Sequence, residues 1–216
     1  MYGDELNMEP AEFYETMRKG ELPKSMANNP AVIQEKFEAV LKEGKDIIHM
    51  TLSSGISGTY NSAVIARDEM LERYPDRRIA VIDSCCASAG YGLLVDTAWE
   101  MMQAGVTYEE LVSWIEENKK GSTIWFFTSD LTHLRRGGRI SASAAFFGNM
   151  LNICPLMNVN VEGRLIPRDS TGARNVLSGK WWSGMKEHAE QALPITENAS
   201  FPNPPARRCR GQSASW

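Results

Sequence analysis

The fold is decided by the stretch Thr51-Leu52-Ser53-Ser54-Gly55-Ile56-Ser57-Gly58-Thr59-Tyr60. The short apolar run before it, residues 46–52, predicts a buried strand of the parallel type. The residues after it, 60–74, carry apolar positions at helical spacing and predict an amphipathic helix. The stretch is therefore a strand-to-helix turn rich in hydroxyls and glycine. In open α/β sheets, ligands bind at the carboxyl ends of strands, where this turn is expected to lie.

The turn has the chemistry of an anion site. A helix N-terminus presents free N–H groups and a partial positive charge. The three serines of the stretch, Ser53, Ser54 and Ser57, together with a threonine, would make a neutral cradle for an anionic head group. The alternative is an ordinary Ser/Gly cap on the helix, although a single cap does not need this many hydroxyls.

The rest of the chain alternates strands and helices, which predicts a mostly parallel α/β sheet flanked by helices. Residues 1–128 form the expected first lobe, in which Thr107 and Glu110 predict a capping box. Residues 129–193 begin a second, incomplete α/β lobe, and residues 194–216 are proline-rich and expected to be disordered. The expected strands are 46–52, 79–82, 123–127, 153–161 and 164–167, and the expected helices are 11–19, 31–44, 60–74, one ending near 104, 108–119, 141–151 and 174–188.

Composition narrows the function classes. The 216-residue chain has 43% hydrophobic residues and a formal net charge of −4. Without a long basic run, nucleic acid is not expected as a partner. No apolar run approaches the length of a membrane span, and the N-terminus does not read as a signal peptide. We therefore expect a soluble, cytoplasmic protein.

Cysteine and histidine spacing argues against a metal site, and no cofactor is expected. The cysteines show no C-x-x-C spacing, and the three histidines lie far apart in the sequence. Two enzyme hypotheses remain open. The segment around Ser57 nearly matches a nucleophile elbow, but Thr59 replaces the final glycine. Cys86 could act as an activated thiolate at a helix N-terminus, or serve as a small apolar residue in a tight turn.

A basic glycine turn follows the third expected strand. It reads Arg135-Arg136-Gly137-Gly138-Arg139, and Arg139 is a candidate contact for a phosphate or a partner protein. The alternative is a solvated loop. Two glycines alone are weak evidence, because the Walker lysine and its Ser/Thr spacing are absent.

Four segments together resemble one family. Ser53 to Tyr60 reads Ser-Ser-x-x-Ser-Gly-Thr-Tyr, and Asp83 to Gly92 reads Asp-Ser-x-x-Ala-Ser-x-Gly-x-Gly. Leu134 to Ile140 reads Leu-x-x-Gly-Gly-Arg-Ile, and Leu151 to Pro155 reads Leu-Asn-Ile-x-Pro. In this order the segments resemble the DegV family of bacterial fatty-acid-binding proteins, over roughly residues 13–177.

The resemblance implies a DegV-like fold of two α/β lobes with one long-chain acyl group between them. The protein would be a carrier rather than an enzyme, and some family members present the fatty acid to a separate fatty acid kinase. The implied carboxylate site comprises Ser25, Ser54, Ser57 and Gly58. Apolar candidates for the acyl tunnel are Ile56, Phe146, Phe147, Met150, Leu151 and Ile153, which would be ordinary core residues in a protein without a ligand.

The chain departs from the family pattern in three ways. In the upstream loop Ser25 can stand in for the family's threonine, but Met26 occupies the place of the next serine. Cys154 replaces the usual lysine before the proline. The family's first strand and the later part of its second lobe are expected to be missing. A degenerate fragment without a binding function is therefore a third hypothesis beside the carrier and the enzyme.

Overall fold

The computed structural model describes residues 8–122, 124–128, 131–140 and 155–169. Helices and strands alternate from residue 10 to residue 136, and the last two elements are strands within residues 156–169. The elements are α1 (Pro10–Arg18), α2 (Pro30–Lys42), β1 (Ile47–Thr51), α3 (Thr59–Arg73), β2 (Ile79–Asp83), α4 (Ser88–Gln103), α5 (Tyr108–Asn118), the 3-10 helix η1 (Lys119–Gly121), β3 (Trp125–Phe127), α6 (Thr132–Arg136), β4 (Leu156–Val159) and β5 (Leu165–Asp169).

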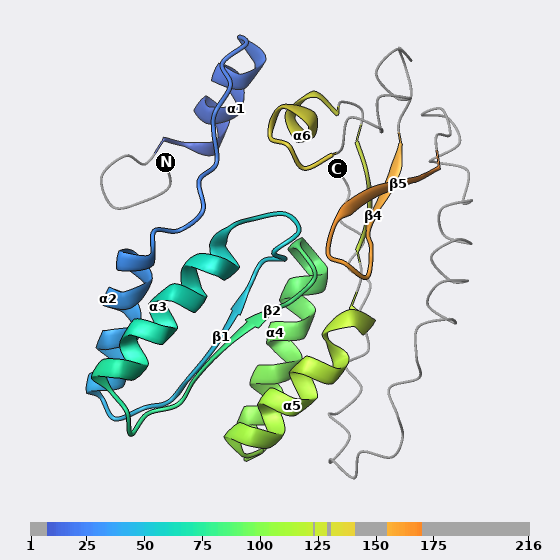
Figure 1. Cartoon of the computed structure of the whole chain (residues 1–216). Coiled ribbons are helices and arrows are strands. Elements are labelled where there is room, and N and C mark those ends of the chain that lie inside the picture. The colour runs from blue at the N-terminus through green and yellow to red at the C-terminus, as the bar shows by residue number, and fades with distance from the viewer. Residues whose placement is uncertain (1–7, 123, 129–130, 141–154, 170–216) are drawn as a thin grey trace.

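A three-layer α/β arrangement forms around the parallel pair β1 and β2. The strands are in register from Ile47 opposite Ile79 to Thr51 opposite Asp83. Helices α2 and α3 cover one face of this pair, and α4 and α5 cover the other (Figure 1). Both faces of the strands are therefore covered, which is why their sequences read as continuous apolar runs.

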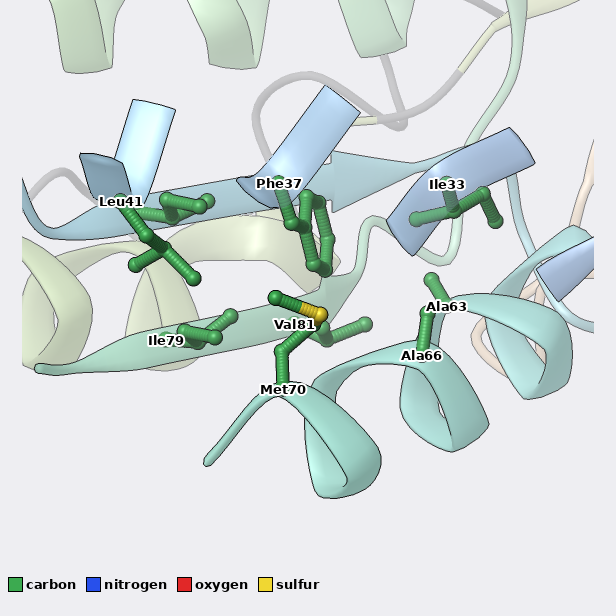
Figure 2. Packing of buried hydrophobic residues seen from close by; sticks show 9 residues of the cluster. Ile33, Phe37, Leu41, Ala63, Ala66, Met70, Ile79 and Val81 are labelled. Carbon is green, nitrogen blue, oxygen red and sulfur yellow. The ribbon is translucent and has the colours of Figure 1, made fainter. Parts of the chain in front are cut away.

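Alternate residues of β2 enter different cores. Ile79 and Val81 pack with Phe37 of α2 and Met70 of α3, while small side chains of α3 allow the two helices to approach closely (Figure 2). Ile82 turns to the opposite face and packs against α4 and α5. The alternation follows from the two-residue repeat of an extended strand.

Local signals set the ends of the helices. The capping box expected at the start of α5 is present, with Glu110 and Thr107 bonded in both directions. The side chain of Asn29 caps α2 by accepting the N–H of Ala31 at 3.0 Å, and Pro30 occupies the first turn. Gly44 lies just beyond α2 with φ at 75°, as expected for a glycine that ends a helix.

The third expected strand joins a different sheet from the one predicted. Strand β3 pairs antiparallel with β4, with Trp125 opposite Asn158, and β4 pairs antiparallel with β5. The expectation that this strand extends the parallel sheet was wrong. An apolar run predicts a strand but does not identify its neighbour, because pairing depends on residues distant in sequence. A domain boundary after residue 128 would separate β3 from β4.

Several expectations lie outside the described residues. They are the helix at 141–151, the helix at 174–188 and the tail at 194–216. The two strands expected at 153–161 and 164–167 correspond to β4 and β5, with shorter or shifted bounds.

Candidate functional site

Ser53 organises the turn that follows β1. Its side chain is fully buried, and its carbonyl accepts the N–H groups of Ile56 and Ser57, each at 3.0 Å. Its hydroxyl accepts the N–H of Gly55 at 3.1 Å and donates to the carbonyl of Gly163 at 2.7 Å. The hydrogen-bonding groups of Ser53 thus bond within the protein, and its hydroxyl is not available to a ligand.

A second turn, after β2, supports the first. The carboxylate of Asp83 accepts the N–H of Ser54 at 3.1 Å and the N–H of Cys85 at 2.9 Å. Ser84 is fully buried and bonds locally to the backbone of Cys86. Ser54 is exposed, and Asp83 engages its backbone N–H, so this N–H is occupied before any ligand arrives.

Ser57 and Gly58 lie at the N-terminus of α3. The half-buried hydroxyl of Ser57 lies 3.0 Å from the hydroxyl of Thr59 and accepts the N–H of Thr59 at 3.3 Å. Gly58 is the N-cap residue of α3 and supplies no side-chain cap. A Cβ on Gly58 would meet the Cβ of Ala27 at 3.6 Å, so the loop containing Ser25 packs directly beside this helix end.

Arg139 joins three segments that are distant in sequence. Its Nε donates to the carbonyl of Ile56 at 3.2 Å, and its Nη2 donates to the Ser25 hydroxyl at 3.1 Å. A third bond, from Nη1 to the carbonyl of Gly137 at 2.7 Å, folds the side chain back over its own turn. The structure therefore brings Ser25, the turn containing Ser57, and Arg139 to one place at the carboxyl end of β1.

The hairpin between β4 and β5 closes another side of the turn. A Cβ on Gly55 would lie 2.7 Å from the carbonyl oxygen of Gly163. Gly163 has φ at 72°, and a Cβ there would lie 2.0 Å from the Ser53 hydroxyl oxygen. Both glycines are required for this close approach of two backbones.

The expected acyl tunnel falls mostly outside the described residues. Ile56 is described and half-buried, and its backbone carbonyl contacts Arg139. The other five tunnel candidates lie in the segment 141–154, of which the structure describes nothing.

The two enzyme hypotheses gain no support from the geometry. Cys86 is fully buried, and burial raises the pKa of its thiol above the ordinary value. Burial, followed by the nearby Asp83 carboxylate, also raises the pKa of Cys85. A thiolate nucleophile needs the opposite shift. Within the part of the chain that the structure describes, the hydroxyl of Ser57 bonds to Thr59 and to no histidine.

Sequence reasoning missed residues that support the turn after β1 without belonging to the expected site. Asp83 and Gly163 hold the turn in place, yet neither was a candidate. Ser53 was expected to offer its hydroxyl to the head group, which was wrong, because that hydroxyl is buried and bonds to Gly55 and Gly163. The Asp-Ser pair at the end of β2 was visible as a polar turn and could have suggested Asp83. No local signal could have identified Gly163, which lies 110 residues from its partner Ser53.

None of the helices that the structure describes has the length and apolar character needed to cross a membrane. Among the described residues, no group of three or more His, Cys, Asp or Glu side chains could hold a metal ion.

Comparison with known proteins places this geometry in a family. The family model described as "Uncharacterised protein, DegV family" matches residues 1–172. The chain belongs to the DegV family. A DegV domain-containing protein of Clostridium perfringens is 43% identical over 166 residues, which are 76% of this chain and 57% of that protein. The chain thus spans little more than half the length of this DegV relative.

Solved DegV-type structures share the fold. A stearic acid-binding protein from Eubacterium ventriosum matches with a TM-score of 0.76 at 26% identity, covering 87% of this chain and 64% of that one. The Fatty Acid Kinase (Fak) B3 protein of Streptococcus pneumoniae, solved loaded with linoleic acid, matches with a TM-score of 0.74 at 26% identity. That match covers 83% of this chain and 63% of the pneumococcal one. The mixed α/β fold expected from the sequence is confirmed.

Proposed function

We propose that this chain is a cytoplasmic, non-enzymatic carrier that holds one long-chain fatty acid. The observation that carries the proposal is the position of Arg139, which donates hydrogen bonds both to Ser25 and to Ile56, 114 and 83 residues away in the sequence. Family membership and the fatty acids named for the solved relatives support it.

The chemistry of the convergence suits a carboxylate. A carboxylate that leaves water needs several hydrogen-bond donors or a cation to replace its hydration. Ser25 and Ser57 offer hydroxyls, the end of α3 offers backbone N–H groups, and Arg139 offers a guanidinium. In this proposal Ser54 adds a further hydroxyl, and Gly58 leaves room for the head group beside the helix end.

In this proposal Arg139 binds the carboxylate of the fatty acid and is not only a contact for phosphate. Its guanidinium already bonds to the hydroxyl of Ser25, a proposed carboxylate donor. Charge-assisted hydrogen bonds are about twice as strong as neutral ones, so Arg139 would both neutralise and orient the head group. The acyl chain would then extend from Ile56 along the apolar segment 146–153.

The carrier would also transfer its fatty acid to a partner protein. A carrier that exposes its carboxylate end could present the bound fatty acid to a separate fatty acid kinase. Similarity to the pneumococcal protein supports this, because that protein is named as part of a fatty acid kinase. Arg139 would then lie where the newly added phosphate forms.

The test is to identify what the purified protein carries. The 216-residue chain is expressed in bacteria, and its organic extract is analysed by mass spectrometry. We expect long-chain fatty acid at close to one molecule per chain, and much less in a Ser57→Ala/Arg139→Ala double variant. A folded protein whose extract contains no fatty acid above a mock purification would contradict the proposal.

A further inference from the structure

The segment 22–28, which connects α1 to α2, has few bonds to the rest of the protein. We call it the strap, and it reads Leu-Pro-Lys-Ser-Met-Ala-Asn. All of its residues are exposed, and none belongs to a helix or a strand. Within the described part of the chain, the strap makes one hydrogen bond, which Arg139 Nη2 donates to the Ser25 hydroxyl at 3.1 Å. A segment with exposed residues and so few bonds opens at a small cost in free energy.

The other side of this contact is fixed. Arg139 Nε donates to the carbonyl of Ile56, and Nη1 donates to the carbonyl of Gly137. Both acceptors are backbone groups outside the strap, so the guanidinium keeps its place when the strap lifts. The strap also rests on the N-terminus of α3, because a Cβ on Gly58 would meet the Cβ of Ala27 at 3.6 Å. The strap therefore lies against the proposed carboxylate site.

Ser25 has a hydrogen-bond donor that the protein does not use. A hydroxyl can donate one hydrogen bond and accept two. The Ser25 oxygen accepts from Arg139, whereas its proton meets no acceptor among the described residues. A carboxylate placed here would accept that proton, and a hydroxyl that accepts and donates at once makes both bonds stronger. The ligand would thus strengthen the bond that holds the strap.

We propose that the strap closes over the head group when a carboxylate binds, with the bond between Arg139 and Ser25 as its latch. This inference rests on the proposed function, because it takes the carboxylate of a fatty acid as the ligand. Binding and closure are then coupled in both directions: the ligand holds the strap closed, and a closed strap binds the ligand more tightly. The loaded and the empty carrier differ in the exposure of residues 22–28.

Cleavage after Lys24 measures how often the strap opens. The 216-residue protein is treated with a lysine-specific protease, with and without saturating oleate, and the cut sites are quantified by mass spectrometry. We expect oleate to slow cleavage after Lys24 by about fivefold or more. Cleavage after Lys45, an exposed residue between α2 and β1, is the control for general stabilisation and should slow much less.

Oleate binding is measured on the same sample by displacement of a fluorescent fatty acid. This separates failure of the strap from failure of the proposed function. Bound oleate with an unchanged cleavage rate at Lys24, or with equal slowing at Lys24 and Lys45, would overturn the strap proposal alone. Absence of oleate binding by folded protein would overturn both proposals.

Variants of Ser25 test the latch. Ser25→Ala removes the hydroxyl, so cleavage after Lys24 should be fast both without oleate and at an oleate concentration that saturates this variant. Ser25→Thr keeps a hydroxyl and should restore the protection. Ser113→Ala, which removes an exposed hydroxyl on α5, is the matched control and should retain the wild-type protection. Full protection in Ser25→Ala would overturn the latch.

A disulfide can hold the strap closed. The Cβ of Ala27 and a Cβ on Gly58 would lie 3.6 Å apart, within the range of about 3.5–4.5 Å found in disulfides. The double variant Ala27→Cys/Gly58→Cys is compared with itself, oxidised and reduced, so any effect of the substitutions on the head group cancels. The wild type, treated in the same way, controls for its own cysteines.

The oxidised double variant should bind oleate about threefold or more tightly than the reduced form, because the strap is already ordered. Equal or weaker binding by the oxidised form would overturn the coupling between closure and binding. Failure of the two cysteines to pair under mild oxidation would overturn the position of the strap on α3.

Discussion

Single side chains around the turn after β1 are distinguished by what they touch. Three serines stand close together in the sequence, yet the structure gives each a different environment. Ser53 is buried and fully bonded, Ser54 is exposed, and Ser57 is half-buried at a helix end. The sequence alone could not show which of the three serines is buried, because burial of Ser53 depends on a hairpin more than a hundred residues away.

Substitution of Ser57 tests the hydroxyl cradle. We expect Ser57→Ala to weaken fatty-acid binding by about 1–3 kcal/mol, because a charged acceptor would lose one donor. The measurement is displacement of a fluorescent fatty acid. Circular dichroism should show an unchanged fold, since the backbone bonds of Ser53 still close the turn. An unchanged dissociation constant would place the head group elsewhere.

Arg139 separates two models of the head-group site. If hydroxyls alone hold the carboxylate, Arg139→Ala spares binding and harms only the transfer to a phosphorylating partner. Because its guanidinium bonds to the Ser25 hydroxyl, we expect Arg139→Ala to weaken binding about tenfold or more. Arg139→Lys keeps the charge but loses the forked geometry, and should give an intermediate value. Wild-type affinity in Arg139→Ala would restrict the residue to the partner contact.

His49 makes the stability of the fold depend on pH. Its ring packs edge-to-face on Phe37 and its Nε2 is buried without a hydrogen bond among the described residues. Burial lowers the pKa of His49 below its ordinary value of 6.5. Between the lowered and the ordinary pKa, the unfolded chain binds more protons, so stability is complete above about pH 6.5 and falls as the pH drops toward the folded-state pKa.

Urea unfolding at pH 8, 6 and 5 measures this dependence. A His49→Gln variant should lose less stability on acidification than the wild type. His133→Gln, at an exposed position, is the control and should follow the wild-type curve. Parallel curves for wild type and His49→Gln would show that another group is responsible.

Elements with strong local signals were predicted closely, and those defined by distant contacts were not. Helices α2, α3 and α5 begin and end within about two residues of the expected bounds. Helix caps and apolar spacing depend only on residues that are close together in the sequence. Strand β3 was expected at the right place but in the wrong sheet. The contact of Arg139 with Ser25 joins positions 114 residues apart and has no signature in either local sequence.

The capping box of α5 should contribute measurably to stability. Thr107→Ala removes the acceptor for the Glu110 N–H, and we expect a loss of about 1 kcal/mol in the free energy of unfolding. Ser113→Ala on the same helix removes only an exposed bond to Glu117 and should cost a few tenths of a kcal/mol. Equal losses would mean that the box is redundant.

At the scale of the whole molecule, the hairpin between β4 and β5 ties the antiparallel sheet to the turn after β1. Gly163→Ala should disrupt this contact for two reasons. The added Cβ would collide with Ser53, and alanine would have to hold a left-handed backbone conformation. Gly105 is a matched control, since its φ is 86° but a Cβ there meets nothing within 4 Å. We expect Gly105→Ala to cost about 1–2 kcal/mol and Gly163→Ala distinctly more.

A double variant identifies the origin of the difference. If collision with the Ser53 hydroxyl causes the extra loss, Ser53→Ala should recover part of it in the Gly163→Ala background. Urea midpoints of the four proteins form the cycle. Strict additivity of the two changes would show that the clash is relieved in some other way.

The tie at Gly163 also dictates an order of events during synthesis. The parallel strand pair and its helices are complete in sequence by residue 118, whereas the hairpin that supports their turn follows about forty residues later. On the ribosome, the nascent chain will therefore form a sheet in which the turn after β1 is still unsupported. If the proposed function holds, fatty acid should be captured only after the hairpin has emerged, and a pause in translation between these points would hold a folded but empty intermediate on the ribosome.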